Sequence, residues 1–407
     1  MGAEPRRTRV LFIAEGVTLA HVARASELAR LLDPARYEVH AAWDSRYDRL
    51  LGTLPYPVHQ ISSLPTAEFL RRLARGMPMH DTQTLRSYVE EDLAVLSAVK
   101  PDIVIGDFRI SLAASAKVAK VPHVAIANAY WSPFGRQSFQ FPEYDYPLQR
   151  VIGRSGALAL FNLLRPLGFA THTRPLNTVL KEHGLPGIGG DIRTMYTSGD
   201  YTAYTDIPEL VPTFDLPATH RYIGAVLWSP SVELPPWWND LPSDRPIVYA
   251  TLGSSGEADV LPVVLEALAE LPVTVIAATA GRARLTAAPP NAYVAEFLRG
   301  SDAAGRAALV ICNGGSPTTY QALSAGVPVL ALASNNMDQH LNMEAVRGAG
   351  AGEVLRANGV RRDAVRSAVT KMLENPRYAT AAANLRAALR VYEPKACLPS
   401  LIEEVVD

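Results

Sequence analysis

The sequence predicts an α/β protein with two doubly wound, Rossmann-like domains. Three observations carry this prediction: a length of 407 residues, short apolar runs that alternate with helical patterns in both halves, and a proline-rich stretch between the halves. A chain of this length exceeds one ordinary hydrophobic core, so two or three domains are expected. With 48% hydrophobic and 19% charged residues, the composition is that of a soluble globular protein.

The apolar runs are typical of strands buried on both faces of a parallel sheet. They are short, rich in valine and isoleucine, and continuous instead of alternating. Between them lie amphipathic patterns, such as Val22, Ala25, Leu28, Ala29 and Leu32, whose spacing predicts one apolar helix face. The runs fall at residues 9–14, 37–43, 101–106 and 122–128 in the first half, and at 246–253, 272–279, 307–313 and 327–333 in the second.

The boundary between the two domains is expected in a proline-rich segment. Residues 228–246 read WSPSVELPPWWNDLPSDRP, with five prolines and little periodicity, which indicates a linker. The domains would then cover residues 1–227 and 247–407, with a C-terminal helix that packs on either of them. In such proteins, ligands bind at the carboxyl ends of the strands, in the cleft between the domains.

Charge and cysteine usage exclude several functional classes. The formal net charge is −1 and both signs are scattered, so there is no basic surface of the kind that binds nucleic acid. No window is long and apolar enough for a membrane helix, and the start of the chain has no secretory signal. Cys312 and Cys397 are the only cysteines, which is not a disulfide framework, so the cytosol is the expected location.

One segment of the second half has the composition of a ligand-binding turn. After the run AALVICN, the sequence NGGSP predicts a turn, and TTYQALSAG predicts a helix. Gly314 and Gly315 allow close approach of a ligand to the backbone. Ser316, Thr318 and Thr319 lie where the first N–H groups of a helix favour an anion. The alternative is an ordinary strand–helix turn with a serine cap.

A second glycine turn, TLGSSGE, follows the first strand of the same half. It brings Gly253, Ser254 and Ser255 to the carboxyl end of that strand, so two turns would hold a diphosphate from two sides. The alternative is a loop without a ligand. Neither GxGxxG nor GxxxxGK[ST] occurs, and GSSG does not match the GxSxG elbow of hydrolases.

The stretch VICNGGSPTTYQALSAGVPVLALASNNMDQHLN resembles the donor-binding signature of family 1 GT-B glycosyltransferases, which use nucleotide sugars. The resemblance extends to the start of the chain, to PDIVIGDF, to TLGSSG and to the linker. It implies two Rossmann-like domains that face each other across a cleft, an acceptor-binding first half and a donor-binding second half. It also implies sugar transfer with inversion and without a metal or other cofactor, the co-substrate being a UDP- or dTDP-sugar.

The resemblance assigns roles to individual residues of the second half. Gly315, Ser316, Thr318 and Thr319 would lie near the donor diphosphate, with Ser254 and Ser255 approaching from the other turn. Asp338 and Gln339 would hydrogen-bond the hydroxyl groups of the donor sugar, a role that a carboxylate and an amide can fill.

The sequence departs from the family signature at three positions. Asn313 stands where a phosphate-contacting histidine is common, Pro317 where a glycine is usual, and Gln321 where the helix usually has a glutamate. An asparagine amide still donates a hydrogen bond but carries no charge. These changes indicate either a distinct subfamily or a weakened donor site.

His21 matches the position of the family's catalytic histidine. It follows the first strand and begins a helix, and imidazole titrates near neutral pH, as a general base requires. Asp107, directly after the run PDIVIG, is the expected partner of the ring, and Asp44, after the second strand, is the alternative. Without the resemblance, His21 would be read as a polar residue at a helix start.

Aromatic residues are concentrated after the fourth strand. Seven lie within residues 130–146, which is too dense for a solvated loop. They either line a pocket for a hydrophobic or aromatic acceptor or pack the domain, and Tyr130, Trp131 and Phe134 are the acceptor-binding candidates. The seven are Tyr130, Trp131, Phe134, Phe139, Phe141, Tyr144 and Tyr146.

These features predict an inverting glycosyltransferase that acts on a small hydrophobic or aromatic acceptor. His21, assisted by Asp107, would remove the acceptor's proton, and the second domain would stabilise the nucleoside diphosphate as it leaves. Two alternatives remain. One is a nucleotide-sugar epimerase on the same fold, and the other is a catalytically inactive nucleotide-sugar-binding partner protein.

Overall fold

The computed structural model describes residues 6–139, 147–334 and 336–406. By their contacts these residues form two compact units. The first contains residues 6–136, 147–226 and 392–406, and the second contains residues 137–139, 227–334 and 336–391. The C-terminal helix therefore belongs to the first unit. The segment expected as a linker, 228–246, belongs to the second.

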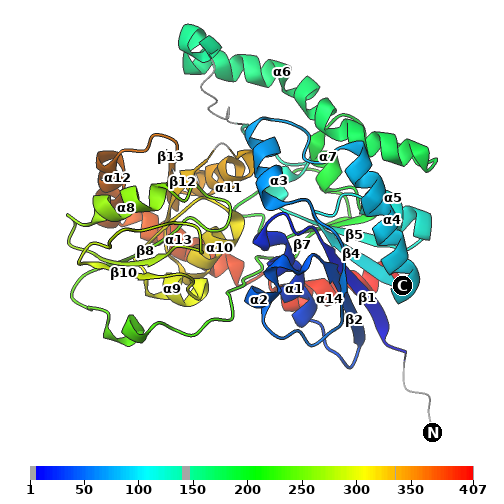
Figure 1. Ribbon diagram of the computed structural model, residues 1–407, viewed down its shortest axis with the longest axis horizontal. Coiled ribbons are helices and arrows are strands. Elements are labelled where there is room, and N and C mark those ends of the chain that lie inside the picture. The colour runs from blue at the N-terminus through cyan, green and yellow to red at the C-terminus, as the bar shows by residue number, and fades with distance from the viewer. Residues whose placement is uncertain (1–5, 140–146, 335, 407) are drawn as a thin grey trace. The chain divides into compact units, whose positions relative to one another are not determined.

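The first unit is built on a parallel sheet with seven strands among the described residues, in the order β3-β2-β1-β4-β5-β6-β7 (Figure 1). The apolar runs identified in the sequence form its centre, where all five residues of β4 and of β5 are buried. Its strands are β1 (Thr8–Ala14), β2 (Tyr37–Trp43), β3 (Val58–Gln60), β4 (Ile103–Asp107), β5 (His123–Ala127), β6 (Tyr201–Tyr204) and β7 (His220–Tyr222).

Helices connect and cover the strands of this first sheet. α4 packs beside α5, and their apolar faces share two cores with β1, β4 and α6. The helices are α1 (Leu19–Arg30), α2 (Asp48–Leu51), α3 (Thr66–Ala74), α4 (Thr82–Val99), α5 (Leu112–Ala119), α6 (Pro147–Glu182), α7 (Ile192–Tyr196) and α14 (Pro394–Val406), with short 3₁₀ turns η1 (Ser45–Tyr47) and η2 (Ala129–Trp131).

The C-terminal helix α14 is fixed to the first unit by packing and by ion pairs. It contacts α1 and β4, and Leu398 and Ile402 are fully buried. Arg221 donates to Glu404 at 3.0 Å, and Arg36 pairs with Glu403. The last helix of the chain is therefore part of the layer that covers the first sheet.

The second unit repeats this architecture with a six-stranded parallel sheet in its described residues, in the order β10-β9-β8-β11-β12-β13. Its strands are β8 (Ile247–Thr251), β9 (Thr274–Ala278), β10 (Ala292–Ala295), β11 (Leu309–Cys312), β12 (Val329–Ala333) and β13 (Gly352–Arg356). Its helices are α8 (Val260–Leu268), α9 (Gly300–Arg306), α10 (Ser316–Ala325), α11 (Met337–Gly348), α12 (Arg362–Glu374) and α13 (Arg377–Leu389), with the 3₁₀ turn η3 (Pro236–Asp240).

The predicted fold class, two doubly wound α/β domains, is confirmed. In each sheet the strand order reverses between two neighbouring central strands, which are β1 and β4 in the first unit and β8 and β11 in the second. At such a switch point the loops that follow the two neighbouring strands diverge and leave a crevice for ligands. Among the described residues, no helix has the length and hydropathy needed to cross a membrane.

Candidate active site

His21 and Asp107 meet at the switch point of the first sheet. β1 and β4 are paired in register from Val10↔Ile103 to Ala14↔Asp107, so Asp107 ends β4 beside the last residue of β1. The chain leaves β1 through a short turn and enters α1 at Leu19, which places His21 in the first turn of that helix. Two residues that are 86 positions apart are therefore brought together by strand pairing.

The geometry of this pair defines the tautomer of the histidine. His21 Nδ1 lies 2.8 Å from Asp107 Oδ1. An ionised carboxylate only accepts hydrogen bonds, so Nδ1 carries the proton, and Nε2 is the acceptor nitrogen of the neutral ring. The Asp107 side chain is fully buried, whereas 20% of the His21 side chain is exposed. The ring is therefore accessible to a substrate, while its partner is not.

Arg24, which the sequence did not single out, holds Asp107 from the other side. Its Nε and Nη2 donate to the two carboxylate oxygens at 2.6 and 2.7 Å. Its Nη1 donates to Asn128 Oδ1 at 2.8 Å and to Thr205 Oγ1 at 3.0 Å. Burial opposes ionisation of Asp107, but the charge and hydrogen bonds of Arg24, with the bond from His21, lower the pKa of that carboxyl overall. Asp107 is thus kept as an anion.

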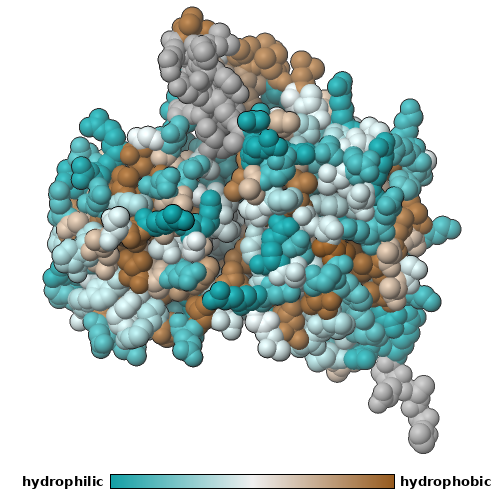
Figure 2. Space-filling model, viewed as in Figure 1, coloured by the Kyte–Doolittle hydropathy of each residue, from teal (hydrophilic) through white to brown (hydrophobic). Residues whose placement is uncertain are grey.

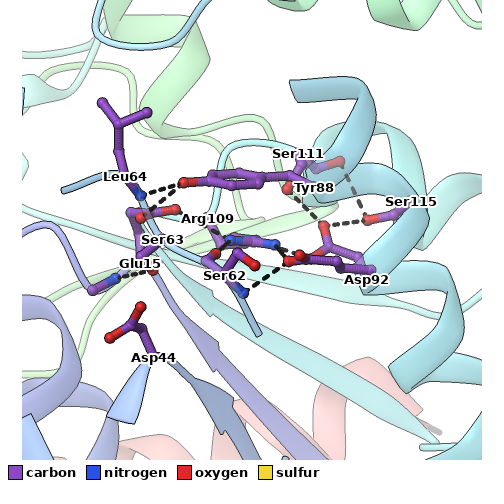
Figure 3. Close-up of polar contacts among 12 residues, drawn as sticks. Glu15, Asp44, Ser62, Ser63, Leu64, Tyr88, Asp92, Arg109, Ser111 and Ser115 are labelled. Atoms are coloured by element: carbon purple, nitrogen blue, oxygen red, sulfur yellow. Dashed lines mark hydrogen bonds and ion pairs between the residues drawn. The ribbon is translucent and has the colours of Figure 1, made fainter. Parts of the chain in front are cut away.

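Asp44 is committed to a different partner. Its carboxylate accepts from Arg46 Nε and Nη2, both at 2.8 Å, and from the backbone N of Arg46 at 3.0 Å. The hydrogen bonds from Arg46 lower the pKa of Asp44, against the effect of partial burial. Figure 3 shows Asp44 near Glu15, without a drawn contact to it. Of the two candidate partners, the structure pairs only Asp107 with the His21 ring.

Phe108, the next residue, lies flat against the His21 ring. The ring centroids are 4.5 Å apart and the planes differ by 6°. Phe108 has a φ of 59°, the left-handed region that non-glycine residues rarely occupy. This backbone conformation turns its side chain in the direction required to cover the imidazole. Asp107 and Phe108 together fix the ring by its edge and by its face.

A chain of rings continues from Phe108 to the predicted aromatic segment. Phe108 stacks on Tyr196 with centroids 5.7 Å apart, and Tyr196 lies 4.9 Å from Trp131. Trp131 therefore belongs to an aromatic group that reaches His21. Tyr130 is buried, and Phe134 packs edge-on against His220 at 5.1 Å. Phe139 belongs to the second unit, and Phe141, Tyr144 and Tyr146 lie outside the described residues.

His80 is excluded as a rival base. Its ring contacts Phe108 and Tyr88, with centroids 6.3 and 5.6 Å away. Neither ring nitrogen has a hydrogen-bond partner among the described residues, and both are buried. Burial, together with the charge of Arg109, lowers the pKa of His80 to about 3. It is a neutral ring without access for a substrate.

Arg109 anchors the same turn in a buried charge network (Figure 3). It donates to Asp92 at 2.9 Å, to Glu91 at 3.1 Å and to Glu15 at 3.3 Å, and its guanidinium lies 3.7 Å from the centroid of the Tyr88 ring. Burial raises the pKa of Glu15, although Arg109 opposes this shift. Further hydrogen bonds to this network come from Ser111 and Ser115, which both donate to Asp92. The network joins the ends of β1 and β4 to α4, so it stabilises the frame that carries His21 and Asp107.

In the second unit, the two glycine turns lie side by side. β8 and β11 are neighbours, so TLGSSGE and NGGSP leave the sheet at the same edge. Gly253 and Gly314 have φ values of 60° and 85°, which glycine adopts without strain. Asn313 joins the turns: its Nδ2 donates to Ser255 Oγ at 3.1 Å, and its Oδ1 accepts from the Gly315 backbone at 3.2 Å.

The predicted hydroxyl residues differ in their accessibility. α10 begins at Ser316, which is buried, and Thr318 is half-buried. Thr319 is fully buried, and its hydroxyl donates to Gly315 O at 2.9 Å. Thr319 therefore supports the turn internally. Asn342, which the sequence did not single out, donates to Gly314 O at 2.8 Å.

Two further residues close to the first turn were not identified from the sequence. Arg282 donates to Ser254 O at 2.6 Å and to Gly256 O at 3.0 Å, so it brings a positive charge to the TLGSSGE turn. Gly256 has no room for a side chain, because a Cβ there would lie 2.3 Å from Leu252 O and 3.0 Å from Asn313 Cβ. Cys312, one residue before the second turn, is buried, and burial raises the pKa of its thiol to about 11.

Asp338 and Gln339 lie in the first turn of α11. Asn336 caps this helix by accepting from the backbone N of Asp338 at 3.0 Å. Gln339 Oε1 accepts from the backbone N and the hydroxyl of Ser334, both at 2.9 Å. These bonds fix the orientation of the amide, and Gln339 Nε2 has no hydrogen-bond partner among the described residues. A buried donor of this kind costs about 1–3 kcal/mol until it is paired.

Known proteins with related sequences carry out sugar transfer. Residues 262–403 match the model of the erythromycin biosynthesis protein CIII-like, C-terminal domain. A PGL/p-HBAD biosynthesis glycosyltransferase of Mycobacterium tuberculosis (strain ATCC 25177 / H37Ra) is 54% identical over 93% of this chain and 88% of its own. A PGL/p-HBAD biosynthesis rhamnosyltransferase of Mycobacterium bovis (strain BCG / Pasteur 1173P2) is 53% identical over 94% and 85%.

Two other comparisons concern the fold of the chain and a relative that is named as inactive. The spinosyn rhamnosyltransferase SpnG, solved with thymidine diphosphate, superposes with a TM-score of 0.71 at 20% identity and covers 97% of this chain and 100% of its own. This likeness confirms the GT-B fold. An inactive PGL/p-HBAD biosynthesis glycosyltransferase of Mycobacterium bovis (strain BCG / Pasteur 1173P2) is 52% identical over 65% of this chain and 71% of its own.

Proposed function

Since the chain belongs to the family 1 GT-B glycosyltransferases of the natural-product type, and is itself a glycosyltransferase, we propose that it transfers a sugar from a nucleoside diphosphate sugar to a hydroxyl group of a hydrophobic or aromatic acceptor, with inversion at the anomeric carbon. The observation that carries the proposal is the pairing of His21 Nδ1 with a fully buried, arginine-bound Asp107.

In the proposed reaction, His21 acts as the general base. The acceptor hydroxyl gives its proton to Nε2, and its oxygen forms a bond to the anomeric carbon as the bond from that carbon to the diphosphate breaks. A single displacement of this kind inverts the configuration. Asp107 stabilises the imidazolium that forms, as a carboxylate does in other histidine-based sites. Arg24 acts through Asp107 by keeping it ionised and in place.

The second unit takes the donor in this proposal. The N-terminus of α10 and the backbone N–H groups of the two glycine turns stabilise the charge that develops on the leaving diphosphate, so the step requires no metal ion. Asn313 and Arg282 shape the TLGSSGE turn, and Arg282 supplies a charge that Asn313 lacks. Asp338 and the Nε2 of Gln339, which has no hydrogen-bond partner among the described residues, bind the hydroxyl groups of the sugar.

Relatives narrow the choice of substrates. One relative is a rhamnosyltransferase, and SpnG, another rhamnosyltransferase, was solved with thymidine diphosphate, so we favour a dTDP-deoxysugar over a UDP-sugar. The acceptor is proposed to be a phenol or a similar aromatic alcohol, because Trp131, Tyr196 and Phe108 form a ring surface next to His21. The named relatives are transferases, which disfavours the epimerase alternative.

The test combines donor screening with product analysis. Thermal shift with dTDP, UDP and their sugars identifies the nucleotide, because a ligand at a hundred times its Kd stabilises by about 2.7 kcal/mol. The selected donor is then incubated with phenolic acceptors, with and without EDTA, and NMR of the product gives the anomeric configuration. Retention of configuration, or dependence on a metal, would contradict the proposed mechanism. Isomerisation of the donor alone would indicate an epimerase, and absence of both reactions an inactive partner.

A further inference from the structure

A series of polar contacts extends from the His21–Asp107 pair along one edge of the first sheet. β1, β4, β5 and β6 are neighbours in that order. Asp107 is the last residue of β4, and Asn128 directly follows β5. Thr205 and Asp206 directly follow β6. Because the carboxyl ends of parallel strands lie at the same edge of a sheet, residues from three strands form one row of polar side chains.

Asn128 connects Arg24 to Asp206 within this row. Its Oδ1 accepts from Arg24 Nη1 at 2.8 Å, and its Nδ2 donates to the two carboxylate oxygens of Asp206 at 3.2 and 3.3 Å. A guanidinium only donates hydrogen bonds and an ionised carboxylate only accepts them, so the two neighbours fix the orientation of the amide. A carboxylate at position 128 would accept from Arg24 but repel Asp206, so the contact requires an amide.

The side chains of this connection are buried. Polar side chains ordinarily lie at the surface, and hydrophilic residues cover much of the face in view in Figure 2. Asn128 and Asp206, in contrast, are 8% and 0% exposed, so water cannot replace a partner that is lost. Burial opposes the charge of Arg24, but the carboxylates of Asp107 and Asp206 help to raise its pKa. Arg24 therefore remains a cation that both carboxylates stabilise.

The same asparagine begins the turn that carries Trp131. Asn128 stands at the N-cap position of η2, and its backbone O accepts from Trp131 N at 2.9 Å. Asparagine usually caps such a turn with its own side chain, but among the described residues the Asn128 amide makes no such bond. Asp206 accepts from the backbone N of Ala129 instead. The position of η2 therefore depends on the two residues that the amide joins to Arg24.

We propose that Asn128 is a positioning residue that sets the acceptor-binding turn η2 relative to the general base. Its amide holds Arg24, which holds Asp107 and thereby the ring of His21, and its backbone holds Trp131. A misplacement of about 1 Å between reacting groups can cost about a hundredfold in rate. Asn128 acts through these neighbours and does not itself touch a substrate. The inference rests on the proposed function, in which His21 is the base and Trp131 contacts the acceptor.

The test exchanges the two ends of the contact between Asn128 and Asp206. Asn128→Asp places two carboxylates side by side, and Asp206→Asn places two amides there. The double variant with both substitutions keeps the formal charge and restores the alternation of donors and acceptors. The carboxylate at position 128 accepts from Arg24, and the amide at position 206 donates to that carboxylate and accepts from the backbone N of Ala129.

Asn177→Asp is the matched control, because it is the same substitution in the same unit. Among the described residues, the Asn177 side chain donates to Gly189 O at 2.8 Å and accepts from the backbone N of Ile188 at 2.8 Å. It has no contact with the row of polar side chains, so this variant should change stability and leave the kinetics of transfer at wild-type values. All kinetics are measured at a temperature at which circular dichroism shows each variant to be folded.

We expect each single variant to lower kcat and to raise the acceptor KM, so that kcat/KM for the acceptor falls by about ten- to a hundredfold. The donor KM should stay close to wild type, because Asn128 and Asp206 belong to the unit that carries the base. The double variant should recover most of the loss. A merely structural role would change the unfolding temperature without this difference between the two KM values.

Asn128→Ser breaks the contact without adding a charge, and it takes the place of any charged variant that does not fold. Wild-type acceptor kinetics in folded Asn128→Asp or Asn128→Ser would overturn the proposal, and so would a folded double variant as impaired as the single ones. His21→Ala is measured alongside. Turnover retained in His21→Ala would contradict the proposed function, whereas its loss there, with wild-type kinetics in the Asn128 variants, would contradict the positioning role alone.

Discussion

His21 Nδ1 lies 2.8 Å from Asp107 Oδ1, and the same carboxylate is held by Arg24 at 2.6 and 2.7 Å. The imidazole is therefore oriented by an anion that cannot rotate away, because both of its oxygens are engaged. This relationship leads to the first two predictions.

Replacing His21 with alanine should lower turnover by about 10²–10⁴-fold and leave donor affinity nearly unchanged, because a positioned general base contributes about that much. Turnover is measured at saturating substrates, and donor affinity by calorimetry. His183→Ala is the control, since His183 is exposed at the end of α6. A His21→Ala variant that keeps more than about a tenth of the wild-type rate would assign the base elsewhere.

Replacing Asp107 with asparagine should reduce both stability and turnover. The change leaves the buried guanidinium of Arg24 without its counter-charge, which costs up to about 3–5 kcal/mol. The pKa of Asp107 is lowered in the folded protein, so its contribution is present above about pH 4 and is lost as pH falls through the folded-state value. The difference in free energy of unfolding between wild type and Asp107→Asn should therefore shrink on acidification. Urea titrations from about pH 7 to about pH 3 measure it, and a constant difference would show that the carboxylate is not the stabilising group.

The two aromatic candidates should respond differently to substitution. Trp131→Leu should raise the KM for the acceptor more than the KM for the donor, because Trp131 is linked through Tyr196 and Phe108 to His21. Phe134→Leu is the matched change, since Phe134 packs on His220. It should affect stability and leave both KM values close to wild type. Equal effects of the two substitutions on the acceptor KM would show that Trp131 is no closer to the acceptor site than Phe134.

At the glycine turns, Gly256→Ala should weaken donor binding. A Cβ there would lie 2.3 Å from Leu252 O and press on Asn313, so the turn must shift, at a cost of about 1–3 kcal/mol. Gly305→Ala is the control, because nothing lies within 4 Å of its added Cβ, and alanine should stabilise α9 by about 0.5–1 kcal/mol. Calorimetric titration of dTDP measures the affinity. Wild-type affinity in Gly256→Ala would show that the turn does not contact the donor.

Asn313→Ala should reduce donor affinity by about 1–3 kcal/mol, the cost of buried partners left unpaired. The substitution releases Ser255 and the Gly315 backbone at once. Asn291→Ala is the matched control in the same unit. Among the described residues Asn291 donates to the carbonyls of Leu268 and Val273, so its replacement should affect stability alone. Donor affinity that is indifferent to both changes would mean that Asn313 has no part in the donor site.

Local patterns in the sequence were enough to predict the central strands. The runs at 9–14, 101–106 and 307–313 form β1, β4 and β11, because strands buried on both faces must be continuous and apolar. The short outer strands β3 and β7 were not predicted. β3 reads VHQ and β7 reads HRY, so their burial is partial and their polar residues hide the pattern.

The residues that hold His21 and Asp107 in place could not be predicted from local sequence patterns. Arg24 lies in an ordinary amphipathic helix, and only the pairing of β1 with β4 brings it to Asp107. Arg109 is two residues after Asp107, but its partners Glu15 and Asp92 come from separate elements. Buried ion pairs are properties of tertiary structure, so a single sequence gives no periodic signal for them. The unit to which the C-terminal helix belongs could not be predicted from local patterns either, because α14 joins the first unit through ion pairs with Arg36 and Arg221.

The left-handed backbone of Phe108 sets a limit on how this protein can be made more thermostable. A non-glycine residue at a φ of 59° costs about 1–2 kcal/mol, which glycine would avoid. Replacement by glycine would also remove the ring that contacts His21, Phe69, His80 and Tyr196, and truncating a packed phenylalanine costs about 3–5 kcal/mol. The packing that is lost exceeds the strain that is relieved, so the protein must keep the unfavourable backbone in order to keep the ring. Selection for heat resistance should therefore retain phenylalanine at position 108.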